Sequence, residues 1–240
     1  MIAVYPGKRR SPMVFGADLI HRHLSFIKNN NLDVGLVTIA VNLEIGSQFD
    51  HLLEYNKNII DELKVDVEFF KRYNIGFSYA AWNDVLTRSI SENQEFDRFL
   101  IFEDDYVPVN PYIIEILNSY IDSDVGYVCQ KVFDNPLHPA LGSGMVTAAA
   151  ARKSFENFER VFSSIDYAMT YPEAELSQRI YARNIVKSGF KLVDYSEDYS
   201  VPFFDSFSRD TPYLVELGNG GSEPLIVPVQ KLLHPELDYK

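Results

Sequence analysis

The chain has 240 residues, of which 46% are hydrophobic and 14% aromatic, so it can build a sizeable core and is not expected to be disordered. Its formal net charge of −12 argues against a broad nucleic-acid-binding surface, but it is compatible with a small phosphorylated ligand. The single cysteine, Cys129, excludes an internal disulfide and is expected to be a core residue of an apolar run. No apolar window is long enough to span a bilayer and no leader-like stretch follows the basic residues 8–10, so we expect a soluble cytoplasmic protein without a transmembrane segment.

The first half of the chain alternates short apolar strands with amphipathic helices. Strands are expected at 2–5, 34–41, 65–70 and 98–102. Helices are expected between them at 17–28, 49–63 and 79–90. This order predicts an α/β fold with a mostly parallel sheet and helices on both of its faces.

The second half is less regular. Helices are expected at 112–121, from about 149 and at 172–188. Strands are expected at 125–132, after a small-residue turn at 140–146, and at 192–195. Loops are expected at 202–204, 206–209 and 218–222. Because there is no repeat or low-complexity tract, we expect one domain over residues 1–240, with an irregular second half.

Residues 99–105, Phe-Leu-Ile-Phe-Glu-Asp-Asp, pass directly from an apolar run to three acids. An apolar run without alternation suits a buried central strand, and ligands of open α/β sheets bind just beyond the carboxyl ends of such strands. Adjacent carboxylates repel one another unless water or a cation screens them, and Mg²⁺ and Mn²⁺ prefer carboxylate and phosphate oxygens. A metal held by Asp104 or Asp105, helped by residues 8–10, would let a diphosphate approach this acidic chain. The same acids also suit a plain solvated turn.

Residues 72–83, Arg-Tyr-Asn-Ile-Gly-Phe-Ser-Tyr-Ala-Ala-Trp-Asn, connect an expected strand to an expected helix. Glycine and asparagine suit a tight turn there, and Ser78 is placed to cap the helix and leave backbone N–H groups for an anion. Together with the acids downstream, this segment resembles the nucleotide-sugar-binding half of GT-A-fold glycosyltransferases of the family 2 type. In those enzymes an N-x-G-x-S-x-x-x-N-like turn precedes an apolar strand that ends in a DxD-type motif. The matching residues here are Asn74, Gly76, Ser78 and Asn83.

The resemblance implies a role for each acid. Glu103, Asp104 and Asp105 stand at the DxD position, in an E-D-D form known from some N-acetylglucosaminyltransferases. Asp105 is then the ligand of Mn²⁺ or Mg²⁺ on the diphosphate, while Asp104 or Glu103 contacts the ribose or the sugar. Residues 1–110 would form the nucleotide-sugar-binding half, and residues 111–240 the acceptor-side half.

Further positions follow from the same resemblance. Asn42 or Glu44 must substitute for the Asp that often follows the second strand and holds the base, for which uridine is commonest in this fold. Small residues at 142–144 would let the backbone pass close to the donor sugar, although a plain tight turn explains them as well. The implied donor-binding residues are Tyr5, Asn42, Arg72, Asn74, Ser78, Glu103, Asp104 and Gly144, and His234 is a candidate second metal ligand.

Residues 172–179, Pro-Glu-Ala-Glu-Leu-Ser-Gln-Arg, resemble the E-D-x-D-L-x-x-R segment of the large inverting family. Alignment of Leu176 and Arg179 puts Glu173 at the usual Asp of the catalytic base, while Pro172 departs from the family's Glu. An inverting transfer needs one carboxylate to take the acceptor proton. The same acids also suit a helix N-terminus, where the helix dipole favours them.

The sequence therefore predicts a metal-dependent, hexosyltransferase-type enzyme that moves a sugar from a nucleoside-diphosphate sugar, with UDP favoured, to a hydroxyl of a glycan or another acceptor. Two alternatives stay open. One is a nucleotidylyltransferase, although the glycine-rich, lysine-bearing signature expected after the first strand is missing from 5–12. The other is an inactive nucleotide-sugar-binding module, which the departures at Pro172 and after the second strand support.

Overall fold

The fold comes from a computed structural model of the chain. It describes residues 1–5, 15–43, 49–134, 137–139, 142–161, 171–205 and 213–233, without the side chains of 171–175, 177, 178, 181, 205 and 213. Within these ranges no helix combines the length and the apolar composition that crossing a membrane requires.

Strands and helices alternate through the first half, as predicted. The strands are β1 (Ile2–Val4), β2 (Leu36–Leu43), β3 (Asp66–Tyr73) and β4 (Arg98–Glu103). The helices are α1 (Gly16–Asn29), α2 (Phe49–Glu62) and α3 (Phe77–Ser91). The four strands are parallel neighbours in the order β4-β1-β2-β3.

Three strands of the second half complete a seven-stranded sheet. They are β6 (Val125–Cys129), β9 (Gly144–Thr147) and β10 (Lys191–Asp194), and the full order is β10-β6-β9-β4-β1-β2-β3. Strand β9 is antiparallel to both of its neighbours, so β6 and β10 run in the same direction as β4. The expected α/β class, a mostly parallel mixed sheet flanked by helices, is confirmed.

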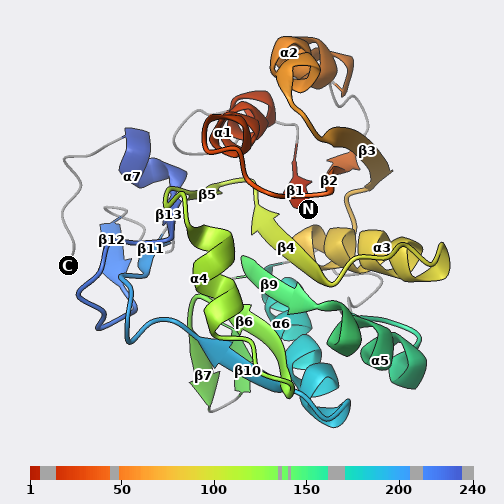
Figure 1. The fold of residues 1–240 in the computed structure, drawn as a ribbon, viewed down its shortest axis with the longest axis vertical. Coiled ribbons are helices and arrows are strands. Elements are labelled where there is room, and N and C mark those ends of the chain that lie inside the picture. The colour runs from red at the N-terminus through yellow and green to blue at the C-terminus, as the bar shows by residue number, and fades with distance from the viewer. Residues whose placement is uncertain are drawn as a thin grey trace.

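Helices cover both faces of the sheet (Figure 1). On one face, α1 and α2 pack on β1 and β2 through a cluster that includes Ile20, Ile39 and Leu52. Helix α4 (Ile113–Ser119) lies on the same face and contacts β4, β6 and β9 through a second cluster. Helices α3, α5 (Ala148–Phe158) and α6 (Tyr171–Lys187) cover the opposite face.

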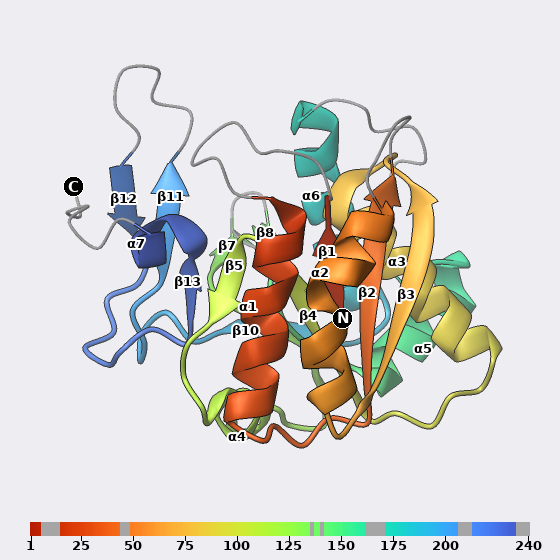
Figure 2. The ribbon, with the colours of Figure 1, turned by 90° about the horizontal axis from the view of Figure 1, so that it is seen from above.

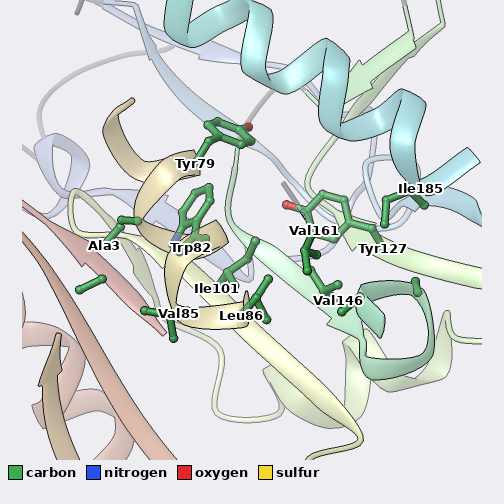
Figure 3. Packing of buried hydrophobic residues seen from close by; sticks show 14 of the residues in the cluster. Ala3, Tyr79, Trp82, Val85, Leu86, Ile101, Tyr127, Val146, Val161 and Ile185 are labelled. Atoms are coloured by element: carbon green, nitrogen blue, oxygen red, sulfur yellow. The ribbon is translucent and has the colours of Figure 1, made fainter. Parts of the chain in front are cut away.

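The core under α3 is centred on a tryptophan. Trp82 is fully buried, and it packs edge-on against Tyr79 with ring centroids 5.1 Å apart. Figure 3 shows Trp82 and Val85 of α3 lying over Ile101 of β4. Because Ile101 precedes the three acids by only two positions, this core supports the end of β4 directly.

Short strands occupy part of the region expected to be loops. The pairs are β5 (Tyr106–Pro108) with β13 (Ile226–Pro228), β7 (Val132–Asp134) with β8 (Leu137–Pro139), and β11 (Pro202–Asp205) with β12 (Tyr213–Glu216); α7 (Val229–Leu233) follows β13. The loop expected at 202–204 is wrong, because that backbone pairs with β12. The strand expected at 125–132 ends at Cys129, since the chain leaves the sheet to form the β7–β8 hairpin. The loop expected at 206–209 lies outside the described residues.

The strand order reverses between β1 and β4. After β1 the chain adds β2 and β3 on one side, and it then crosses to place β4 on the other side. In open α/β sheets ligands bind at such a reversal, outside the carboxyl ends of the strands. We call this side of the sheet, toward which β2 and β3 point in Figure 2, the carboxyl edge, and the opposite side the amino edge.

Candidate functional site

The residue after β1 and the acids at the end of β4 meet where the strand order reverses. The backbone N–H of Tyr5 donates to Asp104 Oδ2 at 3.1 Å, and the N–H of Asp104 donates to the Ala3 carbonyl at 3.1 Å. Asp104 is only 2% exposed. Its carboxylate therefore ties two strand ends together from a buried position.

A histidine of α1 lies beneath the acids. His23 is 1% exposed, and its Nε2 lies 3.1 Å from the Asp104 carbonyl oxygen. Burial lowers the pKa of His23 to about 4, although the hydrogen bond with Asp104 acts in the opposite direction. The imidazole is therefore neutral at pH 7, and Nε2 must carry its proton because a carbonyl oxygen can only accept.

Asp105 is half-buried in the turn between β4 and β5. Its carbonyl accepts a hydrogen bond from the Val229 N–H at 2.8 Å, which anchors the start of α7 beside the acids. In the described part of the chain, no three His, Cys, Asp or Glu side chains gather closely enough to hold a metal ion by themselves. Mg²⁺ is commonly held by one or two carboxylates together with substrate phosphates, so Asp105 fits a site that a bound diphosphate completes rather than a cage made by protein alone.

The segment before β9 packs against Glu103. The Glu103 N–H donates to Ser143 Oγ at 3.1 Å, and the Tyr127 hydroxyl donates to the Gly142 carbonyl at 2.6 Å. A Cβ on Gly142 would lie 2.4 Å from the Trp82 ring and 3.1 Å from Glu103 Oε1. Only glycine lets this backbone reach the acids so closely.

Gly144, which the resemblance implies in donor binding, is buried inside the sheet. A Cβ there would lie 2.2 Å from the Val128 carbonyl oxygen and 2.9 Å from the Tyr127 ring. The close approach of β9 to β6 is therefore sufficient to require glycine at this position.

Arg72 joins the ends of β2 and β3 to α3. Its Nη1 donates to Asn42 Oδ1, its Nε to Asp84 Oδ2 at 2.7 Å and its Nη2 to the Ile75 carbonyl at 2.8 Å. The Arg72 side chain is 11% exposed, and Asn42 is 4% exposed. The planar guanidinium thus holds three elements at fixed angles, and its positive charge is paired with the Asp84 carboxylate.

Helix α3 begins at the same edge after a glycine turn. The Asn74 N–H donates to the Leu43 carbonyl at 2.9 Å, and Gly76 has a φ of 76°. The expectation that Ser78 caps this helix is wrong: the N-cap residue is Gly76, which has no side chain, and Ser78 is the second helical residue. The left-handed turn at Gly76 brings the chain into the helix before Ser78 is reached. The first backbone N–H groups of α3 still face the carboxyl edge, where an anion would be favoured.

The remaining predicted residues are only partly placed. Glu173 belongs to the first turn of α6, but its side chain is outside the description. Figure 2 shows α6 beginning on the side of the carboxyl edge. His234, Glu44 and residues 8–10 lie outside the described residues. The structure thus brings Tyr5, Glu103, Asp104 and Asp105 to one point, and it places Asn42, Arg72, Asn74 and Ser78 at the neighbouring strand ends.

Three contacts at the acids were missed from the sequence. They come from His23, Ser143 and Val229, each far from the acids along the chain. The burial of one of these residues, His23, could have been predicted from the sequence. His23 follows Leu19 and Ile20 by four and three positions, so helical spacing places it on the buried face of α1.

No protein-family model matches the chain, and no curated protein sequence matches it. Distant similarity to solved structures includes S. aureus TarS 1–349, with 10% identity, a TM-score of 0.48, and coverage of 82% of this chain and 58% of that one. It also includes a mutant of Drosophila β1,4-galactosyltransferase 7 in complex with manganese, UDP-Gal and xylobiose, with 11% identity, a TM-score of 0.42, and coverage of 99% and 74%. A third is HddC from Yersinia pseudotuberculosis complexed with GMP-PN, with 10% identity, a TM-score of 0.38, and coverage of 61% and 73%. Likenesses at this level do not assign an activity to this chain.

Proposed function

We propose that the chain is a metal-dependent glycosyltransferase that moves a sugar from a nucleoside-diphosphate sugar to an acceptor hydroxyl. The observation that carries this proposal is the bond between Tyr5 and Asp104, with Asp105 next in the chain, at the strand-order reversal. The GT-A resemblance in the sequence concerns the same acids. Geometry and motif therefore favour one place for the donor.

Asp105 is the proposed metal ligand, because the Asp104 carboxylate already accepts the Tyr5 N–H from a buried position. When bound, Mn²⁺ or Mg²⁺ would neutralise charge on the leaving diphosphate. His234 stays a proposed second ligand on the strength of the resemblance alone.

The nucleotide is proposed to lie across the ends of β1, β2 and β3. The start of α3 supplies positive potential there, which an acidic chain needs in order to attract a diphosphate. Asn42, held by Arg72, and Tyr5 are the proposed neighbours of the nucleoside, for which we infer uridine. Asn74 and Ser78 are proposed on the phosphate side, while Glu103 and Gly144 are proposed near the sugar.

Glu173 is the proposed catalytic base of an inverting transfer. In that reaction the acceptor oxygen bonds to the anomeric carbon while the bond from that carbon to the diphosphate oxygen breaks, and the acceptor proton passes to a carboxylate. The place of Glu173 in the first turn of α6, on the side of the carboxyl edge, supports this role.

A donor screen tests the proposal. The protein is incubated with a panel of UDP-, GDP- and TDP-sugars and Mn²⁺, and release of the nucleoside diphosphate is measured. We expect turnover of one donor, a loss of about 100-fold or more in Asp105→Asn, and no change in Asp66→Asn, an exposed acid at the start of β3. A product with retained anomeric configuration would remove the need for Glu173 as a base. Pyrophosphate release from a nucleoside triphosphate and a sugar phosphate would identify a nucleotidylyltransferase instead, and donor binding without turnover would identify an inactive module.

A further inference from the structure

A pocket of about 570 Å³ lies over α1 and takes its lining from α1, α2, β5 and α7. Figure 2 shows α1 with β5 and α7 on one side of it and α2 on the other. Leu19 of α1, Val107 of β5 and Val229 of α7 form one buried cluster, and Val107 also lines the pocket, so the pocket rests on a packed core. Of the described residues that line it, none belongs to the acids 103–105, so the proposed transfer does not use it.

One side of the pocket is a polar stripe of α1. Asp18, Arg22 and Ser25 all line it, and their spacing of four and three residues places them on one face of the helix. The Asp18 carboxylate accepts a hydrogen bond from the Tyr55 hydroxyl of α2 at 2.6 Å. That bond raises the pKa of Tyr55, while the positive charge of Arg22 acts in the opposite direction, so the guanidinium lies close to the same two groups.

Arg22 carries a charge that no neighbour pairs. Its side chain is partly buried, and it takes part in no hydrogen bond or ion pair with any residue that the structure describes. Asp18 stands four residues before it, where an acid can pair with an arginine along a helix, but its carboxylate bonds to Tyr55 instead. A partly buried cation without a counter-ion is unfavourable, and the planar fork of a guanidinium matches a carboxylate. The structure thus points to an anion beside Arg22.

The other side of the pocket is apolar. Pro108 of β5, the following Val109 and Leu232 of α7 line it. Leu232 is 40% exposed, so a ligand that covers it removes apolar surface from water. A volume of several hundred Å³, a mainly apolar lining and a few polar groups gathered on one side are typical of small-molecule sites.

We propose that this pocket binds a small molecule that carries a single carboxylate on an apolar body. The carboxylate pairs with Arg22 and accepts a hydrogen bond from the Ser25 hydroxyl, while the apolar body lies on Pro108 and Leu232. A dianionic phosphate fits less well, because the Asp18 carboxylate lies one turn from Arg22 and would repel the second charge.

Four probes with one shared apolar group test the charge of the ligand. They are 4-tert-butylbenzoate, 4-tert-butylphenyl phosphate, 4-tert-butylbenzyl alcohol and 4-tert-butylbenzylamine. Binding at pH 7.5 is followed by the NMR shifts of the Ser25 and Val109 amides. We expect a dissociation constant of about 1 mM for the benzoate. The other three probes should bind at least about tenfold more weakly, because none of them brings a single negative charge to Arg22.

Variants assign the binding to named side chains. Arg22→Met keeps the length of the side chain without its charge, and we expect it to reduce the affinity for the benzoate to that for the alcohol. Lys64→Met, which removes an exposed cation outside the pocket, is the matched control and should leave the affinity unchanged. Leu232→Ser should weaken the binding of both the benzoate and the alcohol by about threefold or more, since it removes apolar surface that both use.

Several results would overturn the proposal. They are equal affinities for the benzoate and the alcohol, benzoate binding that survives Arg22→Met, tighter binding of the phosphate than of the benzoate, and no shift of the Ser25 and Val109 amides with any probe. UDP with Mn²⁺ should not displace the benzoate, and displacement would mean that the benzoate occupies the donor site instead. Donor turnover is measured without these probes, so failure here leaves the proposed function untouched.

Discussion

The backbone N–H of Tyr5 donates to Asp104 Oδ2 at 3.1 Å, which joins the end of β1 to the end of β4. The two residues are 99 positions apart in the sequence. Through this bond Asp104 holds the strand ends together, while Asp105, the next residue, is the proposed metal ligand. Mutations should separate the two tasks.

Asp104→Ala is expected to destabilise the protein by about 1–3 kcal/mol, because the half-buried Tyr5 N–H loses the carboxylate of the buried Asp104 as its acceptor. Asp105→Ala is expected to lower the free energy of unfolding by less than Asp104→Ala does, because Asp105 is only half-buried in a turn whereas Asp104 is buried. Urea unfolding measures both. Equal losses in the two variants would show that the tasks are not divided in this way.

Arg72→Met is expected to cost roughly 2 kcal/mol or more, because three hydrogen bonds at the ends of β2, β3 and α3 are lost together. Arg72→Lys should recover little of this loss, since one ammonium cannot reach three acceptors fixed around a planar fork. Lys28→Met, which breaks an exposed pair with Glu62, is the control and should change stability by less than about 1 kcal/mol. A loss in Arg72→Met no larger than in this control would contradict the clamp.

Gly142→Ala is expected to cost about 1–3 kcal/mol, because the new methyl group would collide with the Trp82 ring. Trp82→Phe opens space at that point, so the double variant should lose less stability than the sum of the two single variants. Gly221→Ala is the control, because nothing lies within 4 Å of the position of its Cβ. Strict additivity of Gly142→Ala and Trp82→Phe would argue against the packing of this turn on the core.

The pKa of His23 predicts how stability depends on pH. Its value of about 4 lies below the ordinary 6.5, so the unfolded chain binds the proton first as the pH falls. The stabilisation is complete above pH 6.5 and is lost progressively from there down to about pH 4, by about 2 kcal/mol at pH 5. His23→Gln keeps an N–H donor for the Asp104 carbonyl but does not titrate. Unfolding measured at pH 7.5 and pH 5 should therefore show a smaller loss in His23→Gln than in the parent chain, and equal losses would contradict the burial of a neutral imidazole.

Most of the sheet could be predicted from the sequence, because the residue patterns of its strands and of the flanking helices are strong. The apolar runs that became β2 and β4, and the amphipathic spacing of α1 and α2, predict elements close to those observed. Strands β11 and β13 have three or four residues each, and they form only because a partner strand accepts their hydrogen bonds. The local residue pattern does not indicate whether such a partner strand exists, so these short strands could not be predicted.

The same distinction applies to the candidate site: its local features could be predicted from the sequence, and its long-range contacts could not. The acids at the end of β4 were predicted because an apolar strand that stops at carboxylates is a local feature. The bonds from Tyr5 to Asp104 and from Arg72 to Asn42 depend on strand order, which spacing along the chain does not specify. Ser78 was misplaced as a helix cap because the left-handed turn at Gly76 starts α3 without a side-chain cap.

The most direct test of the central claim is isothermal titration calorimetry of the protein with UDP, with and without Mn²⁺. A site completed by a diphosphate and Asp105 predicts at least about tenfold tighter binding when Mn²⁺ is present, a gain that is lost in Asp105→Asn and kept in Asp66→Asn. If UDP fails to bind, the titration is repeated with the nucleoside diphosphate of the donor that the screen identifies. Binding that is equally tight with and without the metal, or a metal effect that survives Asp105→Asn, would contradict the assignment of this acid.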